Sequence, residues 1–427
     1  MPRFVDTKGL AFAMTDTTIT VNGVDYQVEG EAMLVEALRG PIGTLSVKVG
    51  CDDSTCGTCI VVANGKPVKS CNRPAAGFAG QQIVTTEGLS DREKEVYAHA
   101  YAKTGAVQCG FCTPGMVMAS KALIDKTPEP TREDIAKALR TDICRCTGYR
   151  QIADAVLIAA ELMATGDSIT AGPERMRVSD DAPRPDAAAK VLGTGIFADD
   201  VRIDGMVFAK ALRSPTPRGL LRGIDTSKAA AHPDCLAVLT AADVPENKIG
   251  HIVHDWDVMI PVGSVTRYVG DAIALVATAD ERKLDEILAL IEVDYEPLEP
   301  VTSPQMALHP EAPLVHENGN VLDIEHVKRG NPDAAIREAA YTVSRKFKTP
   351  WQEHAFMEPE CAVAEPVDGG LRMYTSSQSV YDEQHEISRM LKLPLEAIRS
   401  SATLVGGGFG GKEDMSVQHH AALMAWH

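Results

Sequence analysis

The chain has 427 residues, 44% of them hydrophobic and 24% charged, a composition typical of a packed globular protein with about two to four domains. Asp and Glu number 59 against 42 for Lys and Arg, and the resulting charge of −17 argues against nucleic acid or an anionic membrane as the main partner. The sequence has no apolar run long enough for a membrane span and no apolar core behind its charged N-terminus, so we expect a cytoplasmic protein.

Residues 1–89 predict a small β-rich domain. Asn22-Gly23 and Asn64-Gly65 each lie between strand-forming residues, and Asn-Gly is a strong hairpin signal because both central residues adopt positive φ. A short helix at 34–38 is expected between the hairpins, and a further strand at 82–86.

Residues 90–166 change to helical periodicity and predict a bundle of four helices. Ser90 and Glu93 match a capping box, and Thr131 begins a weaker one. Pro114 lies where a first helical turn would begin.

Residues 167–186 are rich in Gly, Pro and charge and predict a linker. We expect an α/β domain over 187–330, with a strand at 272–277, a helix at 281–290 and a strand at 291–295.

The last stretch, 331–427, is expected to contain a short strand at 402–405, a glycine run and a helix from about Met415. The sequence stops inside that predicted helix. We therefore expect an incomplete domain that a second chain or a missing continuation completes.

The cysteines are clustered, since eight of the ten lie between Cys51 and Cys146. In a reducing cytosol such clustering favours metal over disulfides. Cys51-x4-Cys56-x2-Cys59, followed by Cys71, has the spacing of a plant-type [2Fe–2S] site. Structural zinc is the alternative, although zinc prefers two Cys-x2-Cys pairs.

The second set combines Cys109-x2-Cys112 with Cys144-x-Cys146, each pair beside a predicted helix. Alone, the first pair matches a thioredoxin-like redox motif, but that motif needs a βαβ context and would leave the second pair without a role. Two loops between helices would bring the four thiols together.

Gly406, Gly408 and Gly411 satisfy the G-x-G-x-x-G pattern between a predicted strand and a predicted helix. A dinucleotide site would need an acidic residue about 20 positions further on, past the last printed residue. A phosphate-binding P-loop would need Ser or Thr where Glu413 stands. A tight strand-to-helix turn is the third interpretation.

Seven segments together resemble the xanthine dehydrogenase and aldehyde oxidoreductase family of molybdenum hydroxylases. The resemblance covers nearly the whole chain, and the order of the motifs is itself specific. The fused order of the motifs also looks like that of the selenium-dependent xanthine dehydrogenase group. The segments that carry the resemblance are Cys51–Cys71, Gln108–Gly115, Cys144–Tyr149, Asp186–Asp200, Trp351–Pro359, Thr375–Gln378 and Gly406–Glu413.

The resemblance implies an α+β multidomain protein: a β-grasp plant-type ferredoxin domain, a four-helix [2Fe–2S] domain and an incomplete α/β molybdopterin-binding region. It implies a molybdenum–molybdopterin cofactor in the cytosine dinucleotide form, with selenium a candidate ligand of the molybdenum. It also implies two [2Fe–2S] clusters, whose ligands would be Cys51, Cys56, Cys59, Cys71, Cys109, Cys112, Cys144 and Cys146.

By the same resemblance, Gln108 lies beside the second cluster near the pterin, and Gln378 hydrogen-bonds an oxo or sulfido group on the metal. Backbone amides around Gly408, Phe409 and Gly410 approach an oxygen on molybdenum, and a Cβ would block that approach.

Glu413 matches a position that contacts the heterocycle in purine-oxidising members, which favours a purine or related N-heterocycle over an aldehyde or a nicotinate-type substrate. The family's catalytic base is a glutamate near the far C-terminus that no residue here matches, so we nominate no catalytic residue. Residues 165–186 leave no room for a flavin domain. Electrons would therefore leave through a separate flavin subunit or a soluble acceptor.

A competing class is a stand-alone two-cluster electron-transfer protein with a vestigial C-terminal part. The remaining candidates have structural interpretations. His354 is expected to be packed and hydrogen-bonded, and Cys235 and Cys361 are expected to be buried free thiols.

Overall fold

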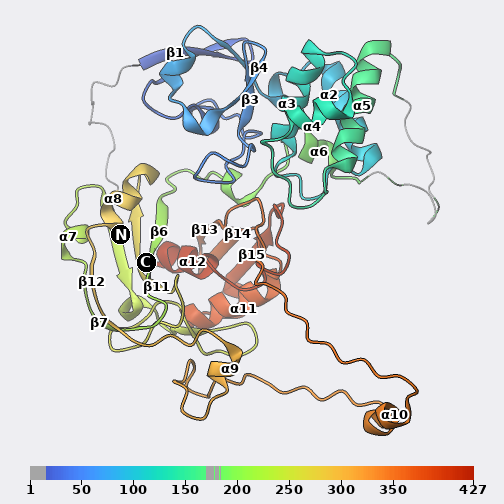
Figure 1. Cartoon of the computed structure of the whole chain (residues 1–427). Helices are drawn as coiled ribbons and strands as arrows, with labels where there is room; N and C mark the ends of the chain where they lie inside the picture. The colour runs from blue at the N-terminus through green and yellow to red at the C-terminus, as the bar shows by residue number, and fades with distance from the viewer. Residues whose placement is uncertain (1–15, 170–176, 178–181, 183) are drawn as a thin grey trace.

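The computed structural model describes residues 16–169, 177, 182 and 184–427, so most of the predicted linker lies outside the described residues (Figure 1). Figure 1 shows two bodies. The first five strands and the helical bundle lie together in one, and the elements from the 3₁₀ helix η4 (Ala198–Asp200) onward form the other.

The first domain is a five-stranded mixed sheet with the order β2-β1-β5-β3-β4, which is the predicted β-grasp arrangement. Both Asn-Gly hairpins form as expected, and Asn22 and Asn64 have positive φ. The helix α1 (Leu34–Arg39) packs its apolar face on the sheet. The strands are β1 (Asp16–Val21), β2 (Val24–Glu29), β3 (Ile60–Ala63), β4 (Lys66–Lys69) and β5 (Gln82–Val84).

The four predicted helices are present, and both capping boxes form, at Ser90 and at Thr131. Their buried faces share one core with Ile60 and Val62 of β3, so the bundle packs directly on the sheet. A short fifth helix, α6 (Ala187–Val191), packs against α2 and α3. The bundle consists of α2 (Asp91–Thr104), α3 (Thr113–Lys126), α4 (Arg132–Ala138) and α5 (Arg150–Thr165).

The second body contains several small sheets. In the first, β11 (Ala272–Thr278) lies between β6 (Phe208–Arg213) and β8 (Cys235–Thr240), and every residue of β11 is buried, as its apolar sequence predicts. A second sheet pairs β7 (Gly219–Asp225) with β12 (Glu292–Pro297). Smaller elements are α7 (Ser227–Ala230), β9 (Lys248–Ile249), β10 (Trp256–Asp257), α8 (Leu284–Leu288) and α9 (Pro304–Ala307).

The last sheet has the order β13-β14-β15, formed by β13 (Ala362–Val367), β14 (Gly370–Thr375) and β15 (Ile398–Ala402). The strands β14 and β15 are parallel and are connected through α11 (Val380–Leu391). The C-terminal helix α12 (Gln418–Trp426) packs on the same core.

Two expectations for this region are wrong in extent. The strand expected at 402–405 ends at Ala402, because Leu404 instead donates its amide to Ile196 and bridges to Phe197. The last helix begins at Gln418 rather than Met415, because the Gln418 side chain accepts the amides of the two residues before it.

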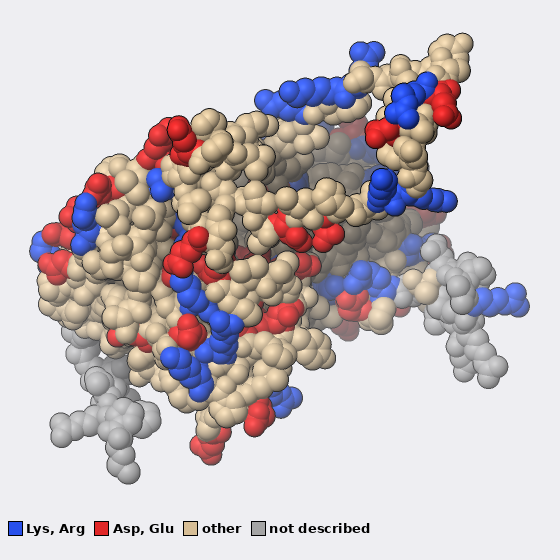
Figure 2. All heavy atoms as spheres, turned by 90° about the horizontal axis from the view of Figure 1, so that it is seen from below, with Lys and Arg blue, Asp and Glu red and all other residues tan. Residues whose placement is uncertain are grey.

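Residues 321–355 form a long exposed arm that carries α10 (Pro332–Glu338) at its far end (Figure 1). Its large apolar side chains include Val327, Tyr341 and Trp351, each more than nine-tenths exposed. The face in Figure 2 has acidic and basic side chains interspersed. Within the described ranges, no helix combines the length and the apolar character that crossing a membrane requires.

Candidate cofactor sites

The first four clustered cysteines gather in the loop that leads into β3 and just after β4. Their thiols interact in two pairs, Cys51 with Cys56 and Cys59 with Cys71. The amide of Cys56 also donates to Cys51 Sγ at 3.4 Å. Burial raises the pKa of the Cys59 thiol to about 12.

The second set gathers where α3 begins and in the loop before α5. The free thiol of Cys109 interacts with that of Cys146, and the thiol of Cys144 interacts with those of Cys112 and Cys146. The hydrogen bond from Cys112 lowers the pKa of the Cys144 thiol far below its usual range. Cys112 and Cys144 are buried.

Glycines let these loops approach closely. Gly110 has φ +91°, and a Cβ there would lie 2.6 Å from Cβ of Lys190 in α6. Gly57 has φ +80°, and its Cβ would lie 2.5 Å from the carbonyl oxygen of Thr141. The two cysteine loops are thus in direct contact, and the amide of Ile143 donates to the Cys56 carbonyl.

An apolar cluster joins the two cysteine sets to the second body. Phe111 and Phe197 meet edge to face with ring centroids 5.2 Å apart. The cluster also contains Cys56 and Met357, and it borders Cys51, Cys109 and Leu404. Phe111 therefore lies between both thiol sets and the glycine-rich segment.

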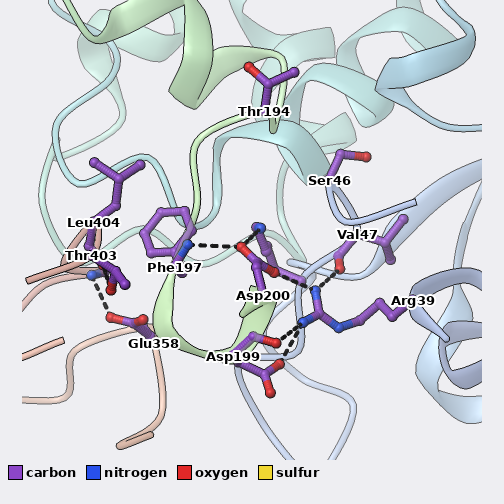
Figure 3. Close-up of polar contacts among 12 residues, drawn as sticks. Arg39, Ser46, Val47, Thr194, Phe197, Asp199, Asp200, Glu358, Thr403 and Leu404 are labelled. Atoms are coloured by element: carbon purple, nitrogen blue, oxygen red, sulfur yellow. Dashed lines mark hydrogen bonds and ion pairs between the residues drawn. The ribbon is translucent and has the colours of Figure 1, made fainter. Parts of the chain in front are cut away.

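A buried ionic network fixes the same junction (Figure 3). Arg39 of α1 donates to both Asp199 and Asp200, at 2.6 and 3.0 Å. Asp200 also accepts from Lys48 Nζ at 2.5 Å and from the Phe197 amide at 2.9 Å. Burial lowers the pKa of Lys48, and the Asp200 carboxylate opposes that shift.

The glycine-rich segment folds around the side chain of Gln378. Its Oε1 accepts from the amides of Gly410 and Lys412, at 3.0 and 3.2 Å. A Cβ on Gly408 would lie 2.2 Å from this oxygen, so any larger residue there would displace the Gln378 side chain from the position it has now. Phe409 is half-exposed at φ +57°. Because α12 does not begin at these glycines, the context that a dinucleotide fingerprint needs is missing.

A buried ion pair beneath the segment fixes its shape. Lys412 Nζ donates to Glu358 Oε2 at 2.8 Å, and both side chains are fully buried. The same carboxylate oxygen accepts the Gly406 amide at 2.6 Å. Burial raises the pKa of Glu358, and Lys412 opposes this shift.

Glu413 is exposed and lines a cavity of about 840 Å³. Trp256, Trp351 and Met415 supply apolar wall, and Glu386 a second carboxylate. The side chain next to the buried Lys412 therefore faces a space large enough for a small-molecule ligand.

Four family models match successive parts of the chain. They are the 2Fe-2S iron-sulfur cluster binding domain (19–83), the [2Fe-2S] binding domain (85–157), the a/b hammerhead domain of aldehyde oxidase and xanthine dehydrogenase (192–299) and the molybdopterin cofactor-binding domain (315–427). The aldehyde oxidoreductase of Megalodesulfovibrio gigas is 32% identical over 426 residues, covering 93% of this chain and 47% of that protein.

Separate subunits of one enzyme match the two bodies. The nicotinate dehydrogenase small FeS subunit of Eubacterium barkeri is 43% identical over 137 residues, 32% of this chain and 87% of the subunit. The large molybdopterin subunit of that enzyme is 35% identical over 244 residues, 57% of each chain. The chain belongs to the xanthine dehydrogenase and aldehyde oxidoreductase family of molybdenum hydroxylases.

This membership confirms the predicted fold class. The solved structure of the aldehyde oxidoreductase from Desulfovibrio gigas has a TM-score of 0.87 at 29% identity and covers 97% of this chain and 48% of its own. The chain spans about half the length of these relatives. The family consists of molybdenum-containing oxidoreductases, and relatives with separate FeS and molybdenum subunits occur in it.

The thiols suit the iron–sulfur groups that the family implies. In the described ranges, no three or more His, Cys, Asp or Glu side chains close around a point that a single ion would occupy. Each set instead divides into two thiol pairs, Cys51/Cys56 with Cys59/Cys71 and Cys109/Cys146 with Cys112/Cys144, and two irons bridged by sulfide need one pair each. In the described part of the glycine-rich segment, the amides of Gly408 and Phe409 donate no hydrogen bond, unlike those of Gly410 and Lys412, and so are open to a cofactor.

The environments of the remaining predicted residues are mixed. Cys235 and Cys361 are free but only half-buried, because they lie at the start of β8 and just before β13. Gln108 is exposed, and its carbonyl accepts from Lys190 Nζ at 3.0 Å. His354 is about half-exposed, although its ring packs against Gly411.

Sequence reasoning assigned no role to the ionic residues of the junction or to the Glu358–Lys412 pair. The available signal was weak: both members of this pair lie inside segments that resemble the family's cofactor-binding motifs. Lys48 and Asp200 are 152 positions apart and give no local pattern.

Proposed function

We propose that the chain is part of a molybdenum hydroxylase that oxidises an N-heterocycle of the xanthine or purine class, with water as the oxygen source. The observation that carries the proposal is the contact between two paired-thiol sites and the glycine cradle, made through Phe111. When bound, the molybdenum cofactor supplies two-electron oxidation of a ring carbon, and two [2Fe–2S] clusters carry the electrons away singly.

We propose separate roles for the residues that would hold the iron–sulfur clusters and those that would hold the molybdenum cofactor. We assign the eight clustered cysteines to the two clusters, and Gln108, Gln378, Gly408, Phe409 and Gly410 to the molybdenum cofactor. Gln378 binds the amides of Gly410 and Lys412 and so shapes the loop, whose neighbouring amides at Gly408 and Phe409 would hold an oxygen of the cofactor. The Glu358–Lys412 pair would keep that loop rigid. No residue of this chain is assigned as the catalytic base.

Glu413 is assigned to the substrate. Its exposed carboxylate at the wall of the 840 Å³ cavity is suited to accept hydrogen bonds from ring N–H groups. A second candidate, aldehyde oxidation, is supported by the likeness to the aldehyde oxidoreductases over nearly the whole chain. An aldehyde offers no ring N–H to this carboxylate.

Substitution of the two residues separates these substrates. Glu413→Ala should lower kcat/KM for purines at least tenfold and leave aldehyde turnover unchanged, since only the heterocycle loses a hydrogen bond. Gln378→Ala should lower turnover of every substrate. Neither variant should reduce the iron–sulfur absorbance. Unchanged purine turnover in Glu413→Ala would contradict the purine assignment.

We further propose that the arm, residues 321–355, binds the remaining molybdenum-region polypeptide, on a second chain or as a continuation of this one. The arm exposes several large apolar side chains to solvent, as a surface that another polypeptide covers would do. This chain also spans about half the length of its relatives. A separate flavin subunit or a soluble acceptor would take the electrons. We also propose a cytoplasmic location for the protein. The proposed domains span residues 1–89, 90–166, 187–330 and 331–427.

The arm proposal predicts a difference between two exposed tyrosines. If the partner is a second chain, Tyr341→Ser on the arm should reduce the amount of that chain that co-purifies. If the partner is a continuation of this chain, the substitution should lower the stability of the protein. Tyr381→Ser on α11 is the matched control and should change neither. Equal effects of the two substitutions would contradict the assignment.

Elemental and nucleotide analysis tests the cofactor. The purified protein should contain molybdenum as well as iron. Acid hydrolysis should release CMP if the cofactor has the cytosine dinucleotide form. Selenium should be assayed in the same sample. Iron without molybdenum in the protein purified with its partners would favour a stand-alone electron-transfer protein.

A further inference from the structure

We infer that Thr147 is a positioning residue whose hydroxyl donates a hydrogen bond to Cys144 Sγ and raises the reduction potential of the second cluster. The inference rests on the proposed assignment of Cys109, Cys112, Cys144 and Cys146 to one [2Fe–2S] cluster. It concerns a side chain that is not itself a ligand.

The direction of the hydrogen bond follows from the proposed role of Cys144 as a thiolate ligand. Thr147 Oγ1 lies 3.1 Å from Cys144 Sγ, and both residues are buried. The hydroxyl oxygen already accepts from the Tyr149 amide at 3.4 Å. Among the described residues, Cys144 Sγ is the acceptor within reach of the remaining hydroxyl proton. A thiolate ligand has no proton of its own, so it must accept.

A second donor points at the same sulfur. The backbone amide of Thr147 lies 3.4 Å from Cys144 Sγ, and the Cys144 amide is itself held by the Tyr149 hydroxyl at 3.0 Å. The loop thus places Thr147 rigidly against the sulfur. Reduction adds negative charge to a cluster, so a donor to a ligand sulfur stabilises the reduced form more than the oxidised one. Burial strengthens the effect.

The first cysteine set contains a similar pair with a different outcome. Thr58 Oγ1 lies 3.2 Å from Cys56 Sγ, but its hydroxyl donates to the Lys48 carbonyl at 3.0 Å. One hydroxyl has one proton, so the carbonyl competes with the sulfur for it. We therefore expect Thr58 to shift its cluster less than Thr147 shifts the second one. The asymmetry favours the second cluster as the first acceptor of electrons.

The test is a redox titration of the complete protein with its co-purifying partners, followed by the EPR signal of each cluster. Thr147→Val should make the potential of one cluster more negative and leave the other unchanged. Thr147→Ser should keep the wild-type potential because it retains the hydroxyl. Thr58→Val should give a smaller shift, in the other cluster.

The outcomes separate this inference from the proposed function. An unchanged potential in Thr147→Val with full iron content would overturn the inference, as would equal shifts of both clusters. If Thr147→Val does not retain iron, Thr147→Ala and Thr147→Ser are compared instead, and equal potentials in those two variants would overturn it. Absence of a second cluster from the wild-type protein would contradict the proposed function itself.

Discussion

At the scale of single residues, glycines decide how closely the cofactor loops approach one another. Gly57, Gly110 and Gly408 each lie where a Cβ would come within 2.6 Å of another part of the chain. Other glycines at positive φ, such as Gly105, have open space around them. The first kind is needed for contact between segments, and the second only for a turn.

Gly110→Ala should therefore lower the iron content of the second cysteine set. The new Cβ would displace α6 or the Cys109–Cys112 loop, and paired thiols tolerate little movement. Gly105→Ala is the control, since Gly105 also has a positive φ, +68°, but has open space where the Cβ would lie. Iron analysis and EPR of the second cluster measure the effect, and equal loss in both variants would argue that backbone strain alone is responsible.

At the scale of elements, local signals predicted most helices and hairpins. Asn-Gly turns, capping boxes and Pro114 each depend on a few adjacent residues, and each element they mark is present. The strand expected at 402–405 failed for a non-local reason. Leu404 pairs with Ile196 and Phe197, over 200 positions earlier, while the less apolar β15 pairs with β14.

The capping box of α2 makes a prediction at this scale. Ser90→Ala should destabilise the helix start by about 1 kcal/mol, because the Glu93 amide loses its acceptor. Ser90→Thr retains the oxygen and is the control. Hydrogen exchange in the first turn of α2 should accelerate about fivefold in the alanine variant, as that free energy implies. Unaltered exchange would show that tertiary packing alone holds this turn.

At the scale of the whole molecule, the two bodies are joined by charge as well as by apolar contact. Arg39 and Lys48 come from the β-grasp domain, whereas Asp199 and Asp200 come from the 3₁₀ helix η4 (Ala198–Asp200). The eight clustered cysteines were identifiable from spacing, but this junction was not, because its residues are adjacent only after folding. Asp200 holds the amide of Phe197 (Figure 3), and the Phe197 ring packs against Phe111 between the cofactor sites.

Asp200→Asn should destabilise the junction by on the order of 3 kcal/mol, because two buried cations lose a carboxylate that both contact. Asp199→Asn is the control. Its side chain is half-exposed, so its loss should cost about 1 kcal/mol or less. Thermal unfolding together with hydrogen exchange in η4 ranks the two, and equal effects would contradict the network's role.

The most direct test of the central claim is the iron content of the purified protein, measured together with the EPR spectrum of its reduced form. Two [2Fe–2S] clusters predict about four iron per chain and two distinct signals. About two iron per chain with one signal, or a single zinc ion in either cysteine set, would contradict the account.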